Sequence, residues 1–566
     1  MPEYQAKTAF EAGNRAEPIS REAASSTLAG LRVPLLLFGL CLAAQLYLVF
    51  FKSLNWDEFL HFSMVYQLKA GTLVQSFQVF HLRLLSWAPD SANNLLDQMR
   101  AARIFIWGMH VLTLFMIYGV ARQFTNVGNA FFASFAYLTA GYAFTQGFSI
   151  RADPLVTATL MSALFLLASG RLSIGKAVGI GALIGLAGMM TFKAMFFAPC
   201  FAGLAWLQYR QAADKHRLLA GLAVLAVVAL ASFAAIYQLH TWNIPERTER
   251  LRNPSSVAFY LRWFTPDLPF AAYIGREIIL APLFFLSLIF APQAWKKAGL
   301  ERDSKLAIAG FIAPLAVLLF YRNTFPYFFV FILAPVAVAI APALGLLRDR
   351  YGNAFLAIAL SVIPLALAVL EPREVIVRQK ALIDYVHREF PHKTGYLDYS
   401  GMIADYPRIF DYLTSGNGIR LYHESGEPIV GREIDRGNLP FIIANQHAIV
   451  AALQGRPEPG SFLPADLSAM TGNYVQQWGV LWREGRQIPA GTKSFEFLLR
   501  RSGDFVLAGG PLGIDGATVT NGGRIHLDKG RHVVRGGRIH ASTLWRGDRL
   551  PAPPPKLPMN SVFTNF

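Results

Sequence analysis

The chain has 566 residues, of which 54% are hydrophobic and only 16% are charged. Because a soluble domain carries about 25% charged residues, this composition excludes an ordinary soluble fold and indicates an integral membrane protein. The net charge of +16 does not indicate nucleic-acid binding, since cytoplasmic loops of membrane proteins collect Lys and Arg, and two cysteines in apolar runs exclude a disulfide framework.

The first part of the chain predicts a polytopic helical bundle. Residues 1–30 are polar and predict a disordered cytoplasmic tail, and residues 31–51 are apolar over a length that crosses a bilayer. Further apolar runs begin near Ile104, Ala130, Leu155, Ile174, Ala194, Leu218, Ile278, Leu306, Tyr327 and Ala354. The sequence therefore predicts about eleven transmembrane helices within residues 31–370.

The distribution of basic residues predicts the orientation of these helices. With the N-terminus inside, every inside turn contains Lys or Arg, and residues 1–370 hold 29 basic against 17 acidic residues. An odd number of spans then places residues 371–566 on the outer face. Two outer connections are long, at about 52–102 and 240–276, and long connections often build sites. The stretch 59–68 is amphipathic and is expected to lie on the lipid boundary.

Residues 371–566 have the composition of a soluble domain. A helix is expected over Val375–Phe390, with short strands over Thr394–Asp398 and Phe441–Ala444. From about residue 495 the chain alternates short strands with Gly-rich turns, which predicts a β-sandwich-like end. The expected strands are Phe495–Arg500, Asp504–Ala508, Gly516–Thr520, Gly523–Leu527 and His532–Arg535. The Pro-rich C-terminal tail is expected to be loose.

Two acidic motifs could carry chemistry at the outer face. Asp57 and Glu58 follow the first span directly, where carboxylates suit a general base or a metal ligand. The alternative is structural, because Asn55 three residues before Glu58 has capping-box spacing. Asp153, in a short outer turn, could share a divalent metal with Asp57 or orient an acceptor hydroxyl. Its alternative is an N-cap followed by Pro154.

Cations gather on the same predicted face. Positive-inside logic disfavours basic residues in short outer turns, yet Arg151, Lys193 and Arg322 occupy three of them. Arg83 and His81 lie in the first long connection. A phosphate at the outer boundary would give these cations a partner, although each could alternatively be a snorkelling side chain.

Five segments in order resemble the GT-C membrane glycosyltransferases, in the branch of the protein O-mannosyltransferases and the lipid A aminoarabinose transferase. The resemblance covers about residues 30–345 and departs from the family pattern at Phe192 and Ala194, which flank Lys193. The segments are Asp57-Glu58, Arg103, the hairpin from Ala121-Arg122 to Ser149–Leu155, Gly185-Leu186-Ala187 with Thr191-Phe192-Lys193, and Tyr321-Arg322 with Pro326-Tyr327 and Pro335.

The resemblance implies an inverting hexosyl- or pentosyltransferase that moves a sugar from a polyprenyl-phosphate donor to a lipid, glycan or protein acceptor. It implies Asp57 as general base, Glu58 and Asp153 as orienting residues or metal ligands, and a divalent ion in some members. The donor phosphate would contact Arg83, Arg151, Lys193 and Arg322, with His81 and Tyr327 as further candidates.

The expected location is the bacterial inner membrane, with the C-terminal domain in the periplasm. Two other classes stay open. A transporter or flippase for a lipid-linked glycan would also need cations near a phosphate, although the spans show no repeat. A non-catalytic envelope scaffold would not need Asp57.

Overall fold

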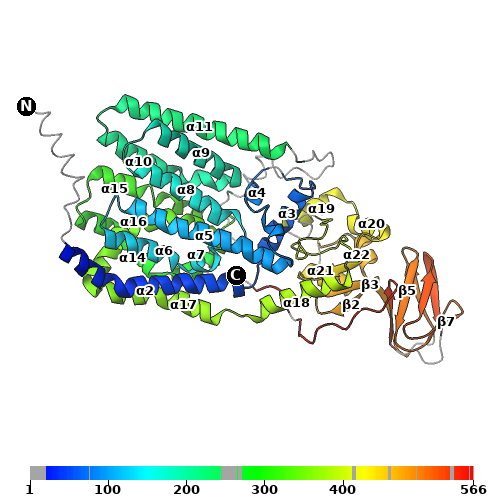
Figure 1. Ribbon diagram of the computed structural model, residues 1–566. Helices are drawn as coiled ribbons and strands as arrows, with labels where there is room; N and C mark the ends of the chain where they lie inside the picture. Colours follow the sequence, from blue (N-terminus) through cyan, green and yellow to red (C-terminus); the bar gives the residue numbers. More distant parts are fainter. Residues whose placement is uncertain are drawn as a thin grey trace, which may run out of the picture.

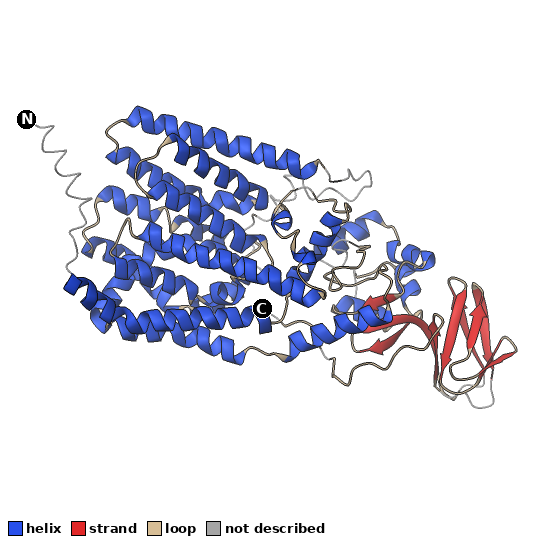
Figure 2. Cartoon of the chain, viewed as in Figure 1, coloured by secondary structure: helices blue, strands red, loops and turns tan. Residues whose placement is uncertain are grey.

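The computed structural model describes residues 21–566 except 76, 243, 245–263, 265–269, 411–415, 457–460, 492–493, 536–540, 560 and 565–566. Most of the predicted N-terminal tail and most of the second long connection lie outside these residues. The described helices form a bundle, and the strands lie beyond one end of it (Figures 1 and 2).

The bundle begins with α2 and ends with α17. Its elements are α2 (Arg21–Phe51), α3 (Trp56–Lys69), α4 (His81–Leu84), η1 (Ala88–Asp90), α5 (Leu95–Ala121), α6 (Val127–Leu138), α7 (Gly141–Gln146), α8 (Ala152–Ala168), α9 (Ile174–Met190), η2 (Phe192–Phe197), α10 (Ala198–Gln211), α11 (Lys215–Thr241), α13 (Ala271–Leu280), α14 (Pro282–Lys297), α15 (Arg302–Ala309), η3 (Ala313–Leu319), α16 (Pro326–Tyr351) and α17 (Asn353–Leu370).

The soluble part follows α17. Its helices are α18 (Glu374–Glu389), α19 (Gly416–Ser425), α20 (Ile429–Arg436), α21 (His447–Leu453) and α22 (Pro464–Met470). Its strands are β1 (Phe441–Ile443), β2 (Tyr474–Trp478), β3 (Leu481–Ile488), β4 (Ser494–Leu499), β5 (Gly503–Ala508), β6 (Leu512–Ile514), β7 (Ala517–Val519), β8 (Arg524–Leu527), β9 (Gly530–Arg535) and β10 (Ser542–Arg546).

The protein is an integral membrane protein with a central buried helix. Five described helices are long and apolar enough to cross a bilayer: α2 from Gly30, α5, α11, α16 and α17. Residues 326–345 of α16 are all buried, whereas only 6% of the apolar window of α11 is buried. α16 is therefore the core of the bundle, and α11, along one edge in Figure 1, faces lipid.

The predicted count of about eleven spans is not confirmed. Each of the predicted apolar runs contains helix, but several helices are short or broken. α13 and α14 meet at a bend of 92° and count as a sixth span only together, and α6, α8 and α9 have 10–17 residues. The breaks occur before Pro282, before the Ala198-Pro199 start of α10 and between α15 and η3, which contains Pro314. Proline lacks an N–H, so it starts a new helix more readily than it continues one.

α3 and α4, from the first connection, lie at the end of the bundle that faces the soluble part (Figure 1). Sequence predicted that the apolar face of residues 59–68 meets lipid. Instead Phe59, Phe62 and Val65 are buried against protein. The soluble part covers this helix: a side chain on Gly401 would meet Ser63, and the Phe59 ring lies 6.0 Å from the Phe563 ring.

Two sheets form the C-terminal end of the soluble part. One has the strand order β1-β3-β10-β5-β8 with β2 on β3, and the other has the order β4-β9-β6-β7. All pairs are antiparallel, and apolar side chains from both sheets, including Phe497 and Leu544, share one buried cluster. This is a sandwich-like arrangement. Four strands, β2, β3, β6 and β10, were not predicted from the sequence. The strand expected over Thr394–Asp398 is reduced to isolated bridges at Tyr396 and Leu397.

The Pro-rich tail is packed on the protein, not loose as expected. Val562 is only 2% exposed, and its carbonyl accepts a hydrogen bond from the Gln379 amide at 2.8 Å. Ser53 and Thr564 share a hydrogen bond of 3.0 Å. The tail therefore returns to the end of α2, because α18 and the α2–α3 junction offer it buried polar partners.

Candidate functional site

Asp57 lies in the first turn of α3, which a capping box starts. The Asn55 Oδ1 accepts the Glu58 N–H at 3.0 Å, and the Glu58 Oε2 accepts the Asn55 N–H at 3.1 Å. The structural alternative for this motif is thus present. Asp57 itself takes no part in the cap, and its side chain is 19% exposed. The cap fixes the backbone and leaves this carboxylate free for other partners.

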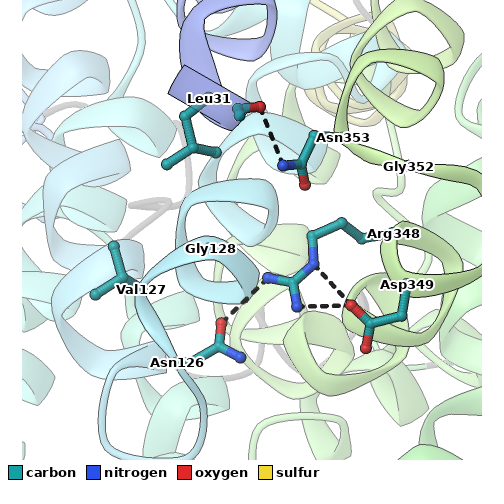
Figure 3. A pocket seen from close by; sticks show the side chains of 9 residues that line it. Leu31, Asn126, Val127, Gly128, Arg348, Asp349, Gly352 and Asn353 are labelled. Atoms are coloured by element: carbon teal, nitrogen blue, oxygen red, sulfur yellow. Dashed lines mark hydrogen bonds and ion pairs between the residues drawn. The ribbon is translucent and has the colours of Figure 1, made fainter. Parts of the chain in front are cut away.

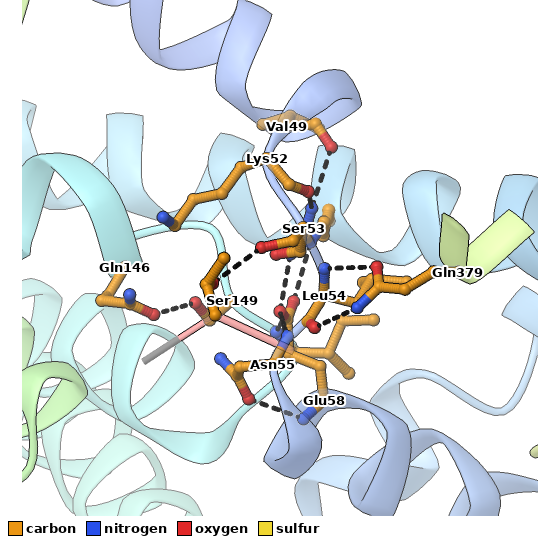
Figure 4. Close-up of polar contacts among 12 residues, drawn as sticks. Val49, Lys52, Ser53, Leu54, Asn55, Glu58, Gln146, Ser149 and Gln379 are labelled. Carbon is orange, nitrogen blue, oxygen red and sulfur yellow. Dashed lines mark hydrogen bonds and ion pairs between the residues drawn. The ribbon is translucent and has the colours of Figure 1, made fainter. Parts of the chain in front are cut away.

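Glu58 belongs to a buried polar cluster at the start of α3, where Figure 4 shows it beside Asn55. Its two oxygens accept bonds from Arg103 Nε and Nη2 at 2.7 and 2.6 Å, and neither side chain is more than 1% exposed. Glu58 Oε1 also accepts the Ile150 N–H at 3.1 Å. Glu58 therefore ties α3 to α5 and to the turn that carries Arg151. It is a positioning residue for Asp57 and Arg151.

A chain of alternating charges extends from Asp57. Arg151 Nη1 pairs with Asp57, Arg151 Nε lies 3.5 Å from Asp153 Oδ2, and Lys193 Nζ pairs with Asp153. The side chains of Arg151, Asp153 and Lys193 are 11%, 2% and 9% exposed. The Arg151 guanidinium lies 3.3 Å from the centre of the Tyr327 ring at the start of α16. We name these five residues the charge network.

The backbone around Asp153 and Lys193 explains their positions. Asp153 was a candidate N-cap, but α8 begins at Ala152 and its N-cap, Arg151, makes no side-chain capping bond. The expected cap is therefore wrong, because the Asp153 carboxylate pairs with cations instead. On the other side, Thr191 ends α9 in an extended conformation and its hydroxyl accepts the Lys193 N–H at 3.3 Å. This turn directs Lys193 toward Asp153.

The predicted sharing of a metal by Asp57 and Asp153 does not fit this arrangement. Arg151 contacts both carboxylates, and Lys193 neutralises the second. Among the described residues, no group of three His, Cys, Asp or Glu side chains could hold a metal ion. The network is instead a set of paired charges in which an anion would compete for the cations.

Burial and the network act in opposite directions on Asp57. Burial raises the pKa of Asp57, and the Arg151 guanidinium lowers it, with Asp153 and Glu58 adding smaller upward contributions. The net direction is upward from the ordinary value of 3.8. A carboxylate with a raised pKa is a stronger base, as a general base requires.

The remaining predicted residues lie outside the charge network. Arg83 donates to His240 Nδ1 at 2.7 Å and to the His240 carbonyl at 2.8 Å, so it is held by the end of α11. Arg322 is exposed. His81 is fully buried, and its Nε2 lies 2.9 Å from His61 Nδ1. Its place in the site therefore depends on His61.

Two residues near the network were missed by sequence reasoning. His61 follows Asp57 by four residues on α3, so the two share a helix face, a spacing that could have identified it. Tyr399 belongs to the soluble part. Burial and the nearby Asp57 raise the pKa of Tyr399 to about 12, and its ring centre lies 6.2 Å from that of Trp56. No local pattern in the sequence relates Tyr399 to Asp57.

A shallow cavity of about 500 Å³ lies elsewhere, between the first membrane turn of α2, the start of α6 and the α16–α17 junction (Figure 3). Its Arg348 already bonds Asp349 at 2.7 Å and Asn126 at 3.4 Å. Arg348 and Tyr327 are separated by about 30 Å along α16, at 1.5 Å per residue. None of the residues that sequence analysis selected for the site lines this cavity.

No protein-family model and no curated protein sequence matches the chain. Among solved structures, the apo oligosaccharyltransferase of Archaeoglobus fulgidus is similar over 78% of this chain and 72% of that chain, with 14% identity and a TM-score of 0.47. ArnT from Cupriavidus metallidurans, bound to undecaprenyl phosphate, is similar over 71% of this chain and 79% of that chain, with 16% identity and a TM-score of 0.46.

A third similar structure is the Archaeoglobus fulgidus oligosaccharyltransferase AglB in complex with an inhibitory peptide and a dolichol-phosphate. It is similar over 88% of this chain and 76% of that chain, with 13% identity and a TM-score of 0.45. At these identities the roles of individual residues depend on the contacts of this chain.

Proposed function

We propose that this protein is an inverting glycosyltransferase that moves a sugar from a polyprenyl-phosphate donor to an acceptor hydroxyl at the outer face of a membrane. The observation that carries the proposal is the buried charge network of Asp57, Arg151, Asp153, Lys193 and Tyr327. It combines a carboxylate of raised pKa with two cations at one end of a membrane bundle. Base and phosphate-binding groups are the two requirements of this reaction.

The reaction is a single displacement. The acceptor oxygen forms a bond to the anomeric carbon, the bond from that carbon to the phosphate oxygen breaks, and the electron pair leaves with the polyprenyl phosphate. Asp57 takes the acceptor proton, while Arg151 and Lys193 stabilise the negative charge that develops on the phosphate. Attack opposite to the leaving group inverts the configuration at the anomeric carbon.

The ion pairs of the free protein suggest how the base is activated. Arg151 now pairs with Asp57 and lowers its pKa. A donor phosphate competes for the same guanidinium, because two phosphate oxygens can accept parallel hydrogen bonds from this planar group. When Arg151 contacts the phosphate, Asp57 loses its cation and its pKa rises further. Asp57 therefore becomes a stronger base after the donor binds.

The soluble part supplies the remaining wall of the proposed site. Tyr399 lies close enough to Asp57 for the two to interact electrostatically, and the Tyr399 N–H is held by Asn445 Oδ1 at 2.9 Å. We place this part in the periplasm and the helices in the bacterial inner membrane, with Arg83 and Arg322 as outer contacts for the donor. The acceptor would enter between Tyr399 and Asp57.

The test replaces Asp57 by Asn in membranes supplied with a labelled polyprenyl-phosphate sugar. Loss of a general base lowers rates by about 10²–10⁴-fold, so we expect transfer to fall at least a hundredfold. Asp90→Asn is the matched control, because Asp90 lies in the same connection but is 72% exposed and pairs with Lys69. Undiminished transfer by folded Asp57→Asn protein contradicts the proposal. Transbilayer movement of the donor without transfer would indicate a flippase instead.

A further inference from the structure

A pair of histidines lies beside the charge network and has no part in the reaction described above. His81, on the short helix α4, is fully buried, and its Nε2 lies 2.9 Å from Nδ1 of the half-buried His61. His61 is within electrostatic reach of Arg151 and Lys193. It also follows Asp57 by one helical turn on the same face of α3.

Both imidazoles are neutral at physiological pH. Burial lowers the pKa of His81 to about 3, with Arg151 as the next largest cause. Burial, His81 and the two cations of the network lower the pKa of His61 well below its ordinary value of 6.5. Each ring therefore carries a single proton, and a single proton lies between His81 Nε2 and His61 Nδ1.

The buried side of His81 decides where that proton resides. His81 Nδ1 has no hydrogen-bond partner among the residues that the structure describes. If His61 Nδ1 donated to His81 Nε2, the single proton of His81 would be on its own Nδ1. His81 would then carry a buried N–H without an acceptor, which is rare in proteins. If His81 Nε2 donates, Nδ1 is only an unused lone pair. The hydrogen-bond network therefore assigns the donor role to His81 and leaves the proton of His61 on Nε2.

The Nε2–H of His61 differs from the other donors beside the network. Arg151 and Lys193 already pair with carboxylates, whereas His61 Nε2 has no partner among the described residues. An anion that approaches the network therefore meets one donor that it need not compete for. On the reaction proposed above, that anion is the phosphate of the lipid-linked donor.

We propose that His61 is a phosphate-binding residue that donates its Nε2–H to a phosphoryl oxygen of the lipid-linked donor, and that His81 is the positioning residue that holds His61 in this tautomer. The inference rests on the proposed function for the identity of the ligand. His81, selected from the sequence as a site candidate, then acts through His61 and does not touch the phosphate.

The experiment measures the dissociation constant of a short-chain polyprenyl phosphate without sugar, with the full chain in nanodiscs. A hydrogen bond to a charged group contributes enough to change affinity by roughly ten- to a hundredfold, so His61→Phe is expected to weaken binding at least about tenfold. His61→Gln keeps an N–H near the Nε2 position, and we expect it to bind within a few-fold of the wild type. His392→Phe is the control, since His392 is exposed on the soluble part.

The His81 variants test the positioning role by the same measurement. His81→Phe removes the hydrogen bond to His61 Nδ1 and is expected to weaken phosphate binding several-fold. His81→Gln keeps a donor near the Nε2 position and is expected to bind the phosphate like the wild type. A role of His81 in packing alone would not be rescued by Gln. Equal loss in His81→Phe and His81→Gln proteins with unchanged unfolding temperature overturns the assignment of His81.

The outcomes separate this inference from the proposed function. If the wild type does not bind polyprenyl phosphate, both are wrong. If the wild type binds and His61→Phe binds equally well, or if His61→Gln is as weak as His61→Phe, only the inference is overturned. Inorganic phosphate is the second probe. Binding of inorganic phosphate as tightly as the polyprenyl phosphate contradicts a lipid-linked ligand.

Discussion

At the scale of single residues, the site is governed by the cost of burying charge. The two carboxylates and the two cations of the charge network have side chains that are at most 19% exposed, and each is paired with an opposite charge. An unpaired buried ion costs several kcal/mol, so removing one member leaves another uncompensated. The network is therefore balanced in the free protein, and an incoming phosphate changes which charges are paired.

The raised pKa of Asp57 predicts the acid limb of the activity profile. Transfer needs the ionised carboxylate, so activity should fall on acidification at a pH above that of an ordinary aspartate. Arg151→Gln removes the cation that lowers this pKa, so the limb should move to higher pH. The measurement is kcat/KM against pH, with Arg100→Gln as the control. A limb that stays in place in Arg151→Gln contradicts the assignment of the limb to Asp57.

The same pKa shift has the opposite effect on folding. Because burial raises the folded-state pKa of Asp57, its contribution to stability is fully present below the unfolded value of 3.8 and is lost as pH rises through the folded value. The free energy of unfolding and the activity therefore depend on the protonation of Asp57 in opposite directions. This is expected where a base is held in a buried position for function.

Glu58 is expected to matter for stability more than for chemistry. Glu58→Gln leaves Arg103 as a buried cation without its carboxylate, which costs about 3–5 kcal/mol. We expect a clear fall in the apparent unfolding temperature of the purified protein. The control is Asp97→Asn, since the Asp97 pair with Arg100 is partly exposed and contributes at most about 1 kcal/mol. Equal effects of the two substitutions would contradict the positioning role of Glu58.

At the scale of elements, glycines on α9 control the approach of α11. A Cβ on Gly181 would meet the Leu225 carbonyl at 2.6 Å, and one on Gly185 would meet the Ala229 carbonyl at 2.7 Å. The two glycines are four residues apart, so they form one small-residue stripe on a helix face. Because α9 leads directly into the turn that carries Lys193, this packing also positions the cation.

Gly185→Val is therefore expected to separate α9 from α11, lower the unfolding temperature and reduce the affinity for the lipid-linked donor through Lys193. Gly179→Val is the matched control in the same helix, because a Cβ at Gly179 meets no atom within 4 Å. Thermal unfolding and donor binding of the two purified variants provide the measurement. If Gly185→Val behaves like Gly179→Val, the close helix contact is unimportant.

At the scale of the whole molecule, long-range polar contacts join the soluble part to the bundle. The buried Gln379 on α18 accepts the Leu54 N–H at 3.0 Å and donates to the Leu54 carbonyl at 2.7 Å, as Figure 4 shows. Lys52 pairs with Glu371 at 3.0 Å, and the Phe563 ring lies 6.2 Å from that of Trp56. These contacts converge on the residues that precede Asp57, so the soluble part holds the site in place.

The proposed orientation predicts opposite labelling of two cysteines in intact cells. Arg531→Cys on β9 and Lys297→Cys at the end of α14 are both at exposed positions, and the native Cys41 and Cys200 are buried. A membrane-impermeant maleimide should label position 531 once the outer barrier is opened, and position 297 only after the inner membrane is permeabilised. Labelling in the reverse order would place the soluble part and the site on the cytoplasmic face.

The sequence by itself determined the features that depend on local pattern. Apolar runs predicted a membrane bundle, alternating strands predicted the sandwich-like end, and the Asn55–Glu58 spacing predicted the cap that starts α3. The bundle, the strands and the cap could be predicted because helix periodicity, strand alternation and capping act over a few neighbouring residues. The roles of Asp57, Arg151, Asp153, Lys193 and Tyr327 in a site stay predictions.

Only the tertiary structure decided which of these residues meet and which have other partners. Glu58 pairs with Arg103, 45 residues away, and Arg83 pairs with His240, 157 residues away, so neither contact follows from a local pattern. The approach of Tyr399 to Asp57 and the return of the tail to α2 depend on how the soluble part docks. Charged side chains and buried amides pair with whichever groups the fold brings near them, and the spacing of residues in the sequence does not determine these long-range contacts.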